Sequence, residues 1–258
     1  MTVAALFGRK RWLDRYTGMS LRILVFTCIL SGLCAFAQPA AQPAPKLTGF
    51  PFQDESLRYR ILWPGGNNLG EATFSAHHGS SGWTFETSLN ASVPGFALRD
   101  TYRATATDAL CSTEFVRNFS HGSKKSSEKT TFDAHNRRAT RETTLPPDGG
   151  KSDFDIAPCA RDAVTFLYFA RREMGQGRVA PQETVYFGGG YSVRLQYTGE
   201  MSIPVQNKPT VTDHVVVSIK GPRSDASAEV FFARDAARTP LLIKVPLPLG
   251  TLSVELVR

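Results

Sequence analysis

The feature that most constrains the fold of this chain is an alternation of apolar and polar side chains with a period of two. In the segment WTFETSLNASV, residues 83–93, the apolar side chains fall on one face of an extended chain and the polar ones on the other. The same pattern occurs in ESLRYRILW (55–63) and in TLSVELV (251–257). Turn-forming clusters such as PGGNN, HGSKK and PPDGG separate these runs. The pattern predicts an antiparallel β-meander with one buried face.

One segment, CARDAVTFLYFARREMG at residues 159–175, departs from this alternation. Its apolar residues occupy almost the whole circumference of a helix, which is typical of a buried helix. Pro158 suits the first helical position, Asp162 lies early where the helix dipole favours an anion, and Gly175 can end the helix. We therefore predict a mainly β fold: a curved antiparallel meander sheet, an open or partly closed barrel, wrapped around one buried helix.

The first 37 residues have the composition of a secretory signal peptide. A basic beginning precedes the apolar stretch ILVFTCILSGLCAFA, and the small residues Ala35 and Ala37 predict cleavage after Ala37. Met19 is an alternative start, because the sequence from Met19 onward is a complete signal by itself. The apolar stretch is shorter than the roughly 18 residues that a spanning helix needs. We therefore expect an exported protein of the periplasm or cell envelope that is not integral to the membrane.

The rest of the chain divides into two parts. Residues 38–49 are rich in Pro and Ala and predict an extended linker. Residues 50–258 carry the alternating pattern and predict a single β-rich domain.

Two of the four cysteines, Cys28 and Cys34, leave with the predicted signal peptide, so Cys111 and Cys159 remain. In an oxidising compartment, such a pair most simply forms a disulfide. The alternative is two buried free thiols, because spacing alone does not show that the two sulfur atoms meet. A bridge would attach the beginning of the predicted helix to the sheet.

Three segments of the sequence resemble the exported bacterial proteins of the Domain of Unknown Function 3108 family. They are ESLRYRILWPGGNNLGEATF, CARDAVTFLYFARRE and the C-terminal stretch from FFARDAARTPLLIKV to GTLSVEL. The matching positions are Glu55, Leu57, Tyr59, Gly70, Ala72, Asp162, Phe166, Leu167, Tyr168, Arg171, Asp235, Pro240, Gly250 and Leu256. The resemblance spans about residues 50–258. It implies a β-rich fold and an envelope location, and it implies no activity and no catalytic residues.

The residues that carry chemistry are scattered. The five histidines show neither an H-x-x-x-H spacing nor a grouping with cysteine, so we predict no metal site. The chain has no G-x-S-x-G motif, and FGGGYS lacks the Lys and Ser/Thr of a phosphate-binding loop. We therefore predict no catalytic residues, no cofactor and a function that is not enzymatic.

Aromatic residues on the predicted apolar face form the candidate ligand site. If the sheet leaves a cavity beside the helix, an apolar ligand such as a lipid would contact Trp63, Phe74, Trp83, Phe85 and Tyr102. The same residues would equally well build a closed core, and both alternatives stay open. The alternative function is a protein-interaction or assembly module of the cell envelope, which would use sheet edges or the basic hairpin of residues 121–151 to hold another envelope protein.

Residues 121–151 form the most basic stretch of the chain. Its candidates for contact with an anionic partner, such as a lipid headgroup or a polysaccharide, are Lys124, Lys125, Lys129, Arg137, Arg138 and Arg141. The alternative is an ordinary solvated surface, because Glu128, Asp133 and Glu142 are interspersed among them. Nucleic acid is not expected as a partner, since the stretch has only Phe132 as an aromatic residue and the protein is predicted to be exported.

Overall fold

A computed structural model describes residues 55–93, 96–144, 149–222, 225–248 and 250–257. The predicted signal peptide and linker lie outside these residues. All the described elements belong to one compact unit, Pro43–Arg258.

The described residues form fifteen strands and one helix. The elements in chain order are β1 (Glu55–Leu62), β2 (Asn68–Gly79), β3 (Gly82–Val93), β4 (Phe96–Ala106), β5 (Ser112–His121), β6 (Lys124–Asp133), β7 (Arg138–Thr143), β8 (Gly150–Asp155), β9 (Arg161–Asp162), α1 (Ala163–Gly175), β10 (Glu183–Tyr186), β11 (Gly190–Val205), β12 (Lys208–Lys220), β13 (Asp225–Ala233), β14 (Pro240–Leu247) and β15 (Gly250–Val257).

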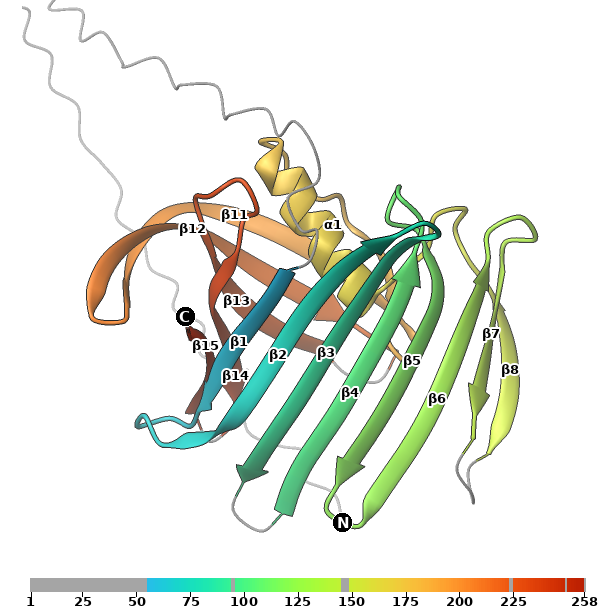
Figure 1. Cartoon of the computed structure of the whole chain (residues 1–258), viewed down its shortest axis with the longest axis horizontal. Coiled ribbons are helices and arrows are strands. Elements are labelled where there is room, and N and C mark those ends of the chain that lie inside the picture. The colour runs from blue at the N-terminus through green and yellow to red at the C-terminus, as the bar shows by residue number, and fades with distance from the viewer. Residues whose placement is uncertain (1–54, 94–95, 145–148, 223–224, 249, 258) are drawn as a thin grey trace, which may run out of the picture. The chain divides into compact units, whose positions relative to one another are not determined.

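All fifteen strands belong to a single sheet in the order β8-β7-β6-β5-β4-β3-β2-β1-β15-β14-β13-β12-β11-β10-β9. Neighbours are antiparallel, apart from the short parallel pairing of β9 with β10. The antiparallel pairing of β1 with β15 joins strands β1 to β8 to the later strands. The first and the last strand of the chain are therefore neighbours in the middle of the sheet (Figure 1). Among the described residues β8 and β9 are the edges, so the sheet is open. The prediction of a mainly β, antiparallel fold is confirmed.

The helix begins later than the sequence predicted. Asp162, not Pro158, marks its N-terminus: the Asp162 carboxylate caps it by accepting hydrogen bonds from the N–H groups of Val164 (2.8 Å) and Thr165 (3.0 Å). Residues 161–162 extend beside β10 as β9 before the chain turns into α1. This pairing holds the preceding backbone in an extended conformation, which excludes an earlier helical turn.

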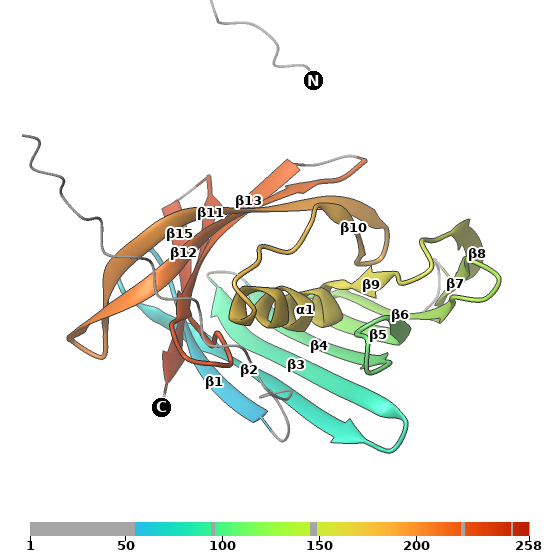
Figure 2. The same cartoon turned by 90° about the horizontal axis from the view of Figure 1, so that it is seen from above.

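The helix α1 packs against β3, β4, β9 and β10, and Figure 2 shows it lying between the β3–β4 region and β10. In this contact the ring of Phe85 stacks on that of Tyr168, with 4.1 Å between centroids, and the ring of Trp83 stacks with that of Phe85 at 5.7 Å. Phe85 and Tyr168 are fully buried. The part of the sheet under α1 is therefore a closed core.

A second hydrophobic cluster lies under β1, β2, β15 and the strands beside them. Its buried members are Tyr59, Ile61, Ala72, Ala91, Leu241 and Leu256. Leu57, Leu69, Phe74, Leu89, Leu98, Leu252 and Val254 pack against these members and stay half-buried. The helix contacts β3 and β4, and it covers the second hydrophobic cluster less completely than the core around Phe85. The prediction that the sheet wraps around the helix therefore holds for only part of the sheet.

Candidate functional site: the cavity beside the Glu55–Arg171 pair

A buried ion pair connects the last turns of α1 to the start of the sheet. Arg171 donates two hydrogen bonds to the Glu55 carboxylate, each 2.7 Å long, and its Nε donates to the Ala237 carbonyl at 3.0 Å. The Arg171 side chain is 1% exposed and that of Glu55 is 11% exposed. Burial alone would lower the pKa of Arg171, but the hydrogen bonds and charge of Glu55 outweigh burial and raise it. Arg171 therefore stays charged, and its hydrogen bonds tie α1, β1 and the β13–β14 loop together.

Two buried tyrosines surround this pair. The hydroxyl of Tyr59 donates to the Pro240 carbonyl at 2.9 Å, which holds the start of β14 against β1. The Arg171 guanidinium lies 4.9 Å from the centre of the Tyr168 ring. Burial raises the pKa of both Tyr59 and Tyr168 above the ordinary value, so both phenols are neutral. The arrangement fixes the geometry of the β13–β14 loop.

A cavity of about 440 Å³ adjoins this junction, between β1, β15 and the β13–β14 loop. Leu57, Leu241 and Leu256 give it an apolar wall that is continuous with the second hydrophobic cluster. Its polar side includes Asp235, whose carboxylate accepts hydrogen bonds from the N–H (3.0 Å) and hydroxyl (2.8 Å) of Thr239. The cavity thus combines an apolar wall with a small number of placed polar groups, as small-molecule sites do.

Several of the positions that carry the resemblance to the Domain of Unknown Function 3108 family gather at this junction. Glu55, Tyr59 and Arg171 build it, Pro240 receives a hydrogen bond within it, and Leu57, Asp235 and Leu256 line the cavity. The sequence alone indicates no function for these positions. The one sequence signal for this site is a charged residue, Arg171, within a segment predicted to form a buried helix.

The aromatic residues proposed from sequence to contact a ligand do not gather at one place. Trp83 and Phe85 belong to the closed core under α1. The hydroxyl of Tyr102 donates to Asp100 at 2.8 Å, and its ring packs against Phe187. Phe74 packs edge-on against Tyr59, with 5.1 Å between ring centroids, in the second hydrophobic cluster, and Trp63 is half-buried just beyond β1. Of the five, Phe74 is the one that packs against the cluster bordering the cavity.

The basic residues of 121–151 are distributed over different surroundings. The Lys129 ammonium lies 2.6 Å from Glu114, and an Arg138 nitrogen lies 3.5 Å from Asp153. Arg141 donates to the Gly188 carbonyl in the β10–β11 turn. Lys124, Lys125 and Arg137 are exposed, and Arg137 has a φ of 52° in the β6–β7 turn. An anionic partner for this stretch stays a prediction.

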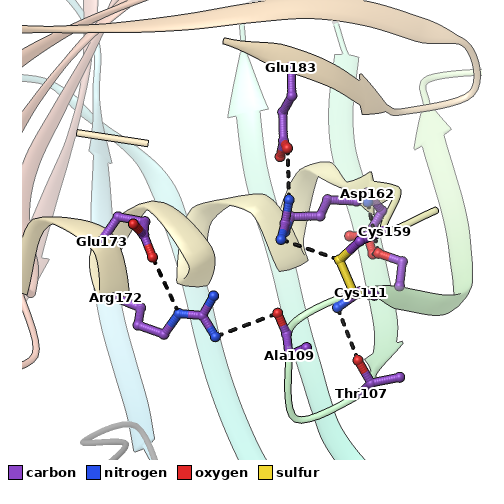
Figure 3. A network of polar contacts seen from close by, with 10 residues as sticks. Thr107, Ala109, Cys111, Cys159, Asp162, Arg172, Glu173 and Glu183 are labelled. Carbon is purple, nitrogen blue, oxygen red and sulfur yellow. Dashed lines mark hydrogen bonds and ion pairs between the residues drawn. A yellow bond between two sulfur atoms is a disulfide. The ribbon is translucent and has the colours of Figure 1, made fainter. Parts of the chain in front are cut away.

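The predicted disulfide is present. Cys111 and Cys159 are bridged with 4.7 Å between their Cα atoms, which joins the residue before β5 to the segment before α1 (Figure 3). Arg161 lies beside the bridge: its Nη2 lies 3.3 Å from the Cys159 sulfur and its Nη1 donates to Glu183 at 2.7 Å. Burial raises the pKa of Glu183, and Arg161 offsets part of that rise. The bridge and this ion pair together fix the N-terminal end of α1.

A model of the family described as protein of unknown function (DUF3108) matches residues 58–257. No curated protein matches the chain. Among solved structures, the chain is similar to a beta-barrel-like protein of the domain of unknown function DUF1849 from Brucella abortus. That similarity has a TM-score of 0.60 and 8% sequence identity, and it covers 81% of this chain and 98% of the other. At this identity the similarity concerns the fold alone. Within the residues that the structure describes, no helix is both long and apolar enough to span a bilayer.

Proposed function

Because this chain belongs to the DUF3108 family, whose description names no activity, we propose its function from the geometry of its own cavity. We propose that it is an exported protein of the periplasm or cell envelope that binds an apolar molecule, such as the acyl chain of a lipid, without acting on it chemically. The cavity of about 440 Å³ beside the Glu55–Arg171 pair is the proposed binding site.

The observation that carries this proposal is the composition of that cavity. Its volume lies in the range of about 300–1,000 Å³ usual for ligand pockets. The leucines of its wall lead into the half-buried residues of the second hydrophobic cluster, so an apolar chain could extend along this face. Burial of a chain there would contribute about 0.8 kcal/mol per CH₂ group. The side chains of Asp235 and Thr239 would face the polar end of the molecule.

Two features support export. The chain begins with the predicted signal peptide, and the described domain carries a disulfide, a bond that persists in oxidising compartments. Cell fractionation with N-terminal sequencing tests this part of the proposal. Mature protein in the periplasm that begins at Gln38 is the expected result, whereas protein that retains Met1 in the cytoplasm would contradict it.

Native mass spectrometry of protein purified from an exporting host tests the binding site. We expect the wild-type protein to retain lipid, and the variant Leu57→Trp, which fills the cavity, to lose it. Leu247→Trp is the matched control because Leu247 is exposed at the end of β14, away from this cavity. Equal lipid retention by both variants would contradict the assignment of the cavity.

A second candidate function, an assembly module, is favoured by one observation. β8 forms an edge of the sheet and is largely exposed, so its backbone groups on one side are available to a strand of another protein. The Ile156 N–H donates to the Arg137 carbonyl, so by the alternation of an antiparallel ladder the N–H groups of residues 152 and 154 face β7 and that of Lys151 faces the free edge. Lys151→Pro would remove one of these free N–H groups from the strand. If the edge holds a partner, this variant should lose the complex in cross-linking experiments and keep its lipid.

A further inference from the structure

A second cavity, of about 200 Å³, lies at the C-terminal end of α1. It is bounded by the residues that follow α1, by β11 and β12, and by the β13–β14 loop. That loop separates it from the first cavity, because Asp235 and Thr239 line the first cavity whereas Arg234 and Arg238 line the second.

Arg238 is the most buried charged residue of this cavity apart from the aspartate with which it pairs. Its side chain is 10% exposed, and its Nη1 donates to the Asp213 carboxylate. Its Nε is buried and has no hydrogen-bond partner among the described residues. Arg238 also has a φ of 48°, a left-handed conformation that is costly for a residue with a Cβ atom and is found at binding sites more often than elsewhere. The loop therefore holds this guanidinium in place at the wall of the cavity. The enclosed Nε is sealed from the cavity, so only the Nη donors that Asp213 leaves free can reach a ligand.

Two further arginines complete the cavity. Arg234 donates from Nη1 to Glu200 at 2.7 Å, and Arg178 donates from Nε to Glu173 at 2.8 Å. A guanidinium has five N–H donors, so these carboxylates use only part of the capacity of each arginine. Arg172 lies 3.7 Å from Glu173, so four arginines share the three carboxylates Asp213, Glu200 and Glu173. The excess is at most one positive charge, and the partial negative charge at the C-terminal end of α1 reduces it. A site with so small an excess favours a monoanion over a dianion.

The remaining walls of the cavity are apolar. Met174 from α1, Val179 from the segment after it and the Tyr197 ring from β11 line it, and Val179 and Tyr197 are 41% and 45% exposed. A ligand that satisfies both kinds of wall has one anionic group and a short apolar body. Among such groups a carboxylate matches the planar fork of a guanidinium, which can donate two parallel hydrogen bonds to it.

We propose that this cavity binds a small organic monocarboxylate. Its carboxylate accepts hydrogen bonds from Arg178, Arg234 and Arg238, and its apolar body lies against Met174 and Val179. The proposal is independent of the apolar-ligand site beside Glu55 and Arg171, since it uses a different cavity.

Saturation-transfer NMR of the mature protein titrated with sodium butyrate, at an ionic strength kept constant with sodium chloride, tests the proposal. We expect saturable binding that is about tenfold weaker in each of Arg178→Gln and Arg234→Gln, because each removes a charge-assisted hydrogen bond. Both side chains are about half exposed, so both variants should fold, which circular dichroism checks. Arg103→Gln is the matched control: Arg103 is similarly exposed and pairs with Glu86 on the outer face of β4.

Three results would overturn the proposal. They are the absence of saturable butyrate binding by the wild-type protein, binding by Arg178→Gln and Arg234→Gln that equals binding by Arg103→Gln, and binding of inorganic phosphate as tight as that of butyrate. The last result would assign the cavity to dianions instead of monocarboxylates.

Discussion

Ser112 and Asp162 hydrogen-bond to each other twice. The Ser112 hydroxyl donates to Asp162 Oδ2 at 2.6 Å and accepts from the Asp162 backbone N–H at 2.8 Å. Ser112 follows Cys111 in the chain, and Asp162 caps α1, so this reciprocal pair lies beside the disulfide and joins β5 to the helix. The N-terminal end of α1 is therefore fixed by a covalent bond and by a buried polar network.

Replacement of Ser112 by Ala should lower the free energy of unfolding by about 1–3 kcal/mol, because the Asp162 carboxylate and N–H both lose a buried partner. Thr113→Ala is the control, since the neighbouring Thr113 hydroxyl bonds to Thr105 at an exposed place. Urea denaturation measures the free energy of unfolding of both variants. Equal stability of the two variants would show that the Ser112–Asp162 pair contributes nothing specific.

Asp162 should also make the stability of the protein depend on pH. Burial raises the pKa of this carboxyl, and its hydrogen bonds lower it by less. The folded state therefore holds the Asp162 proton more tightly than the unfolded state, and this tighter proton binding stabilises the protein. The stabilisation is complete below the unfolded-state pKa of about 3.9. This stabilisation is lost as the pH rises through the higher pKa that Asp162 has in the folded state. Asp162→Asn keeps a capping side chain and cannot ionise. We expect the stability of the wild type relative to this variant to fall as the pH rises above about 4. A difference that rises with pH would contradict the raised pKa.

Removal of the disulfide should destabilise the domain strongly. The bridge closes a loop with a sequence separation of 48 residues, which in the chain-entropy model contributes about 4 kcal/mol. Cys111→Ser and Cys159→Ser should each lower Tm, the double variant should be little worse than either, and reductant should change none of the three further. A single variant that melts like the wild type under oxidising conditions would show that the bridge does not stabilise the fold.

The Glu55–Arg171 pair should matter far more than an exposed pair. Glu55→Gln leaves the buried Arg171 charge uncompensated and should cost about 3–5 kcal/mol. Glu255→Gln, which removes the partner of Arg60 at 3.6 Å on the exposed face, should cost about 0–1 kcal/mol. Chemical denaturation compares the two. If Glu55→Gln and Glu255→Gln lower the free energy of unfolding equally, Glu55 does not act as the buried counter-charge of Arg171.

Phe85 tests the distinction between core and binding site. Phe85→Ala should lower the free energy of unfolding by about 3–5 kcal/mol, because it removes a fully buried ring that stacks with both Trp83 and Tyr168. The folded fraction of this variant should still retain lipid as the wild type does, because Phe85 lies outside the cavity beside Glu55 and Arg171. Loss of lipid from folded Phe85→Ala protein would instead place the ligand under α1.

Local patterns predicted most of the fold and little of the site. Period-two alternation marks a strand with one buried face, so the antiparallel meander could be predicted from the segments where the alternation is clear, such as 83–93. The start of α1 could not, because Pro158 is a good first helical residue locally and is overruled by the pairing of β9 with β10. The Glu55–Arg171 pair joins residues 116 apart in the sequence. Nothing in either segment alone shows that β1 pairs with β15 and brings Glu55 to the helix.

Native mass spectrometry of the purified wild-type protein beside Leu57→Trp and Leu247→Trp tests the central claim most directly. The account predicts that bound lipid is present in the wild type and in Leu247→Trp and is absent from folded Leu57→Trp. A wild-type protein that carries no lipid, or a Leu57→Trp protein that carries as much as the wild type, would contradict it.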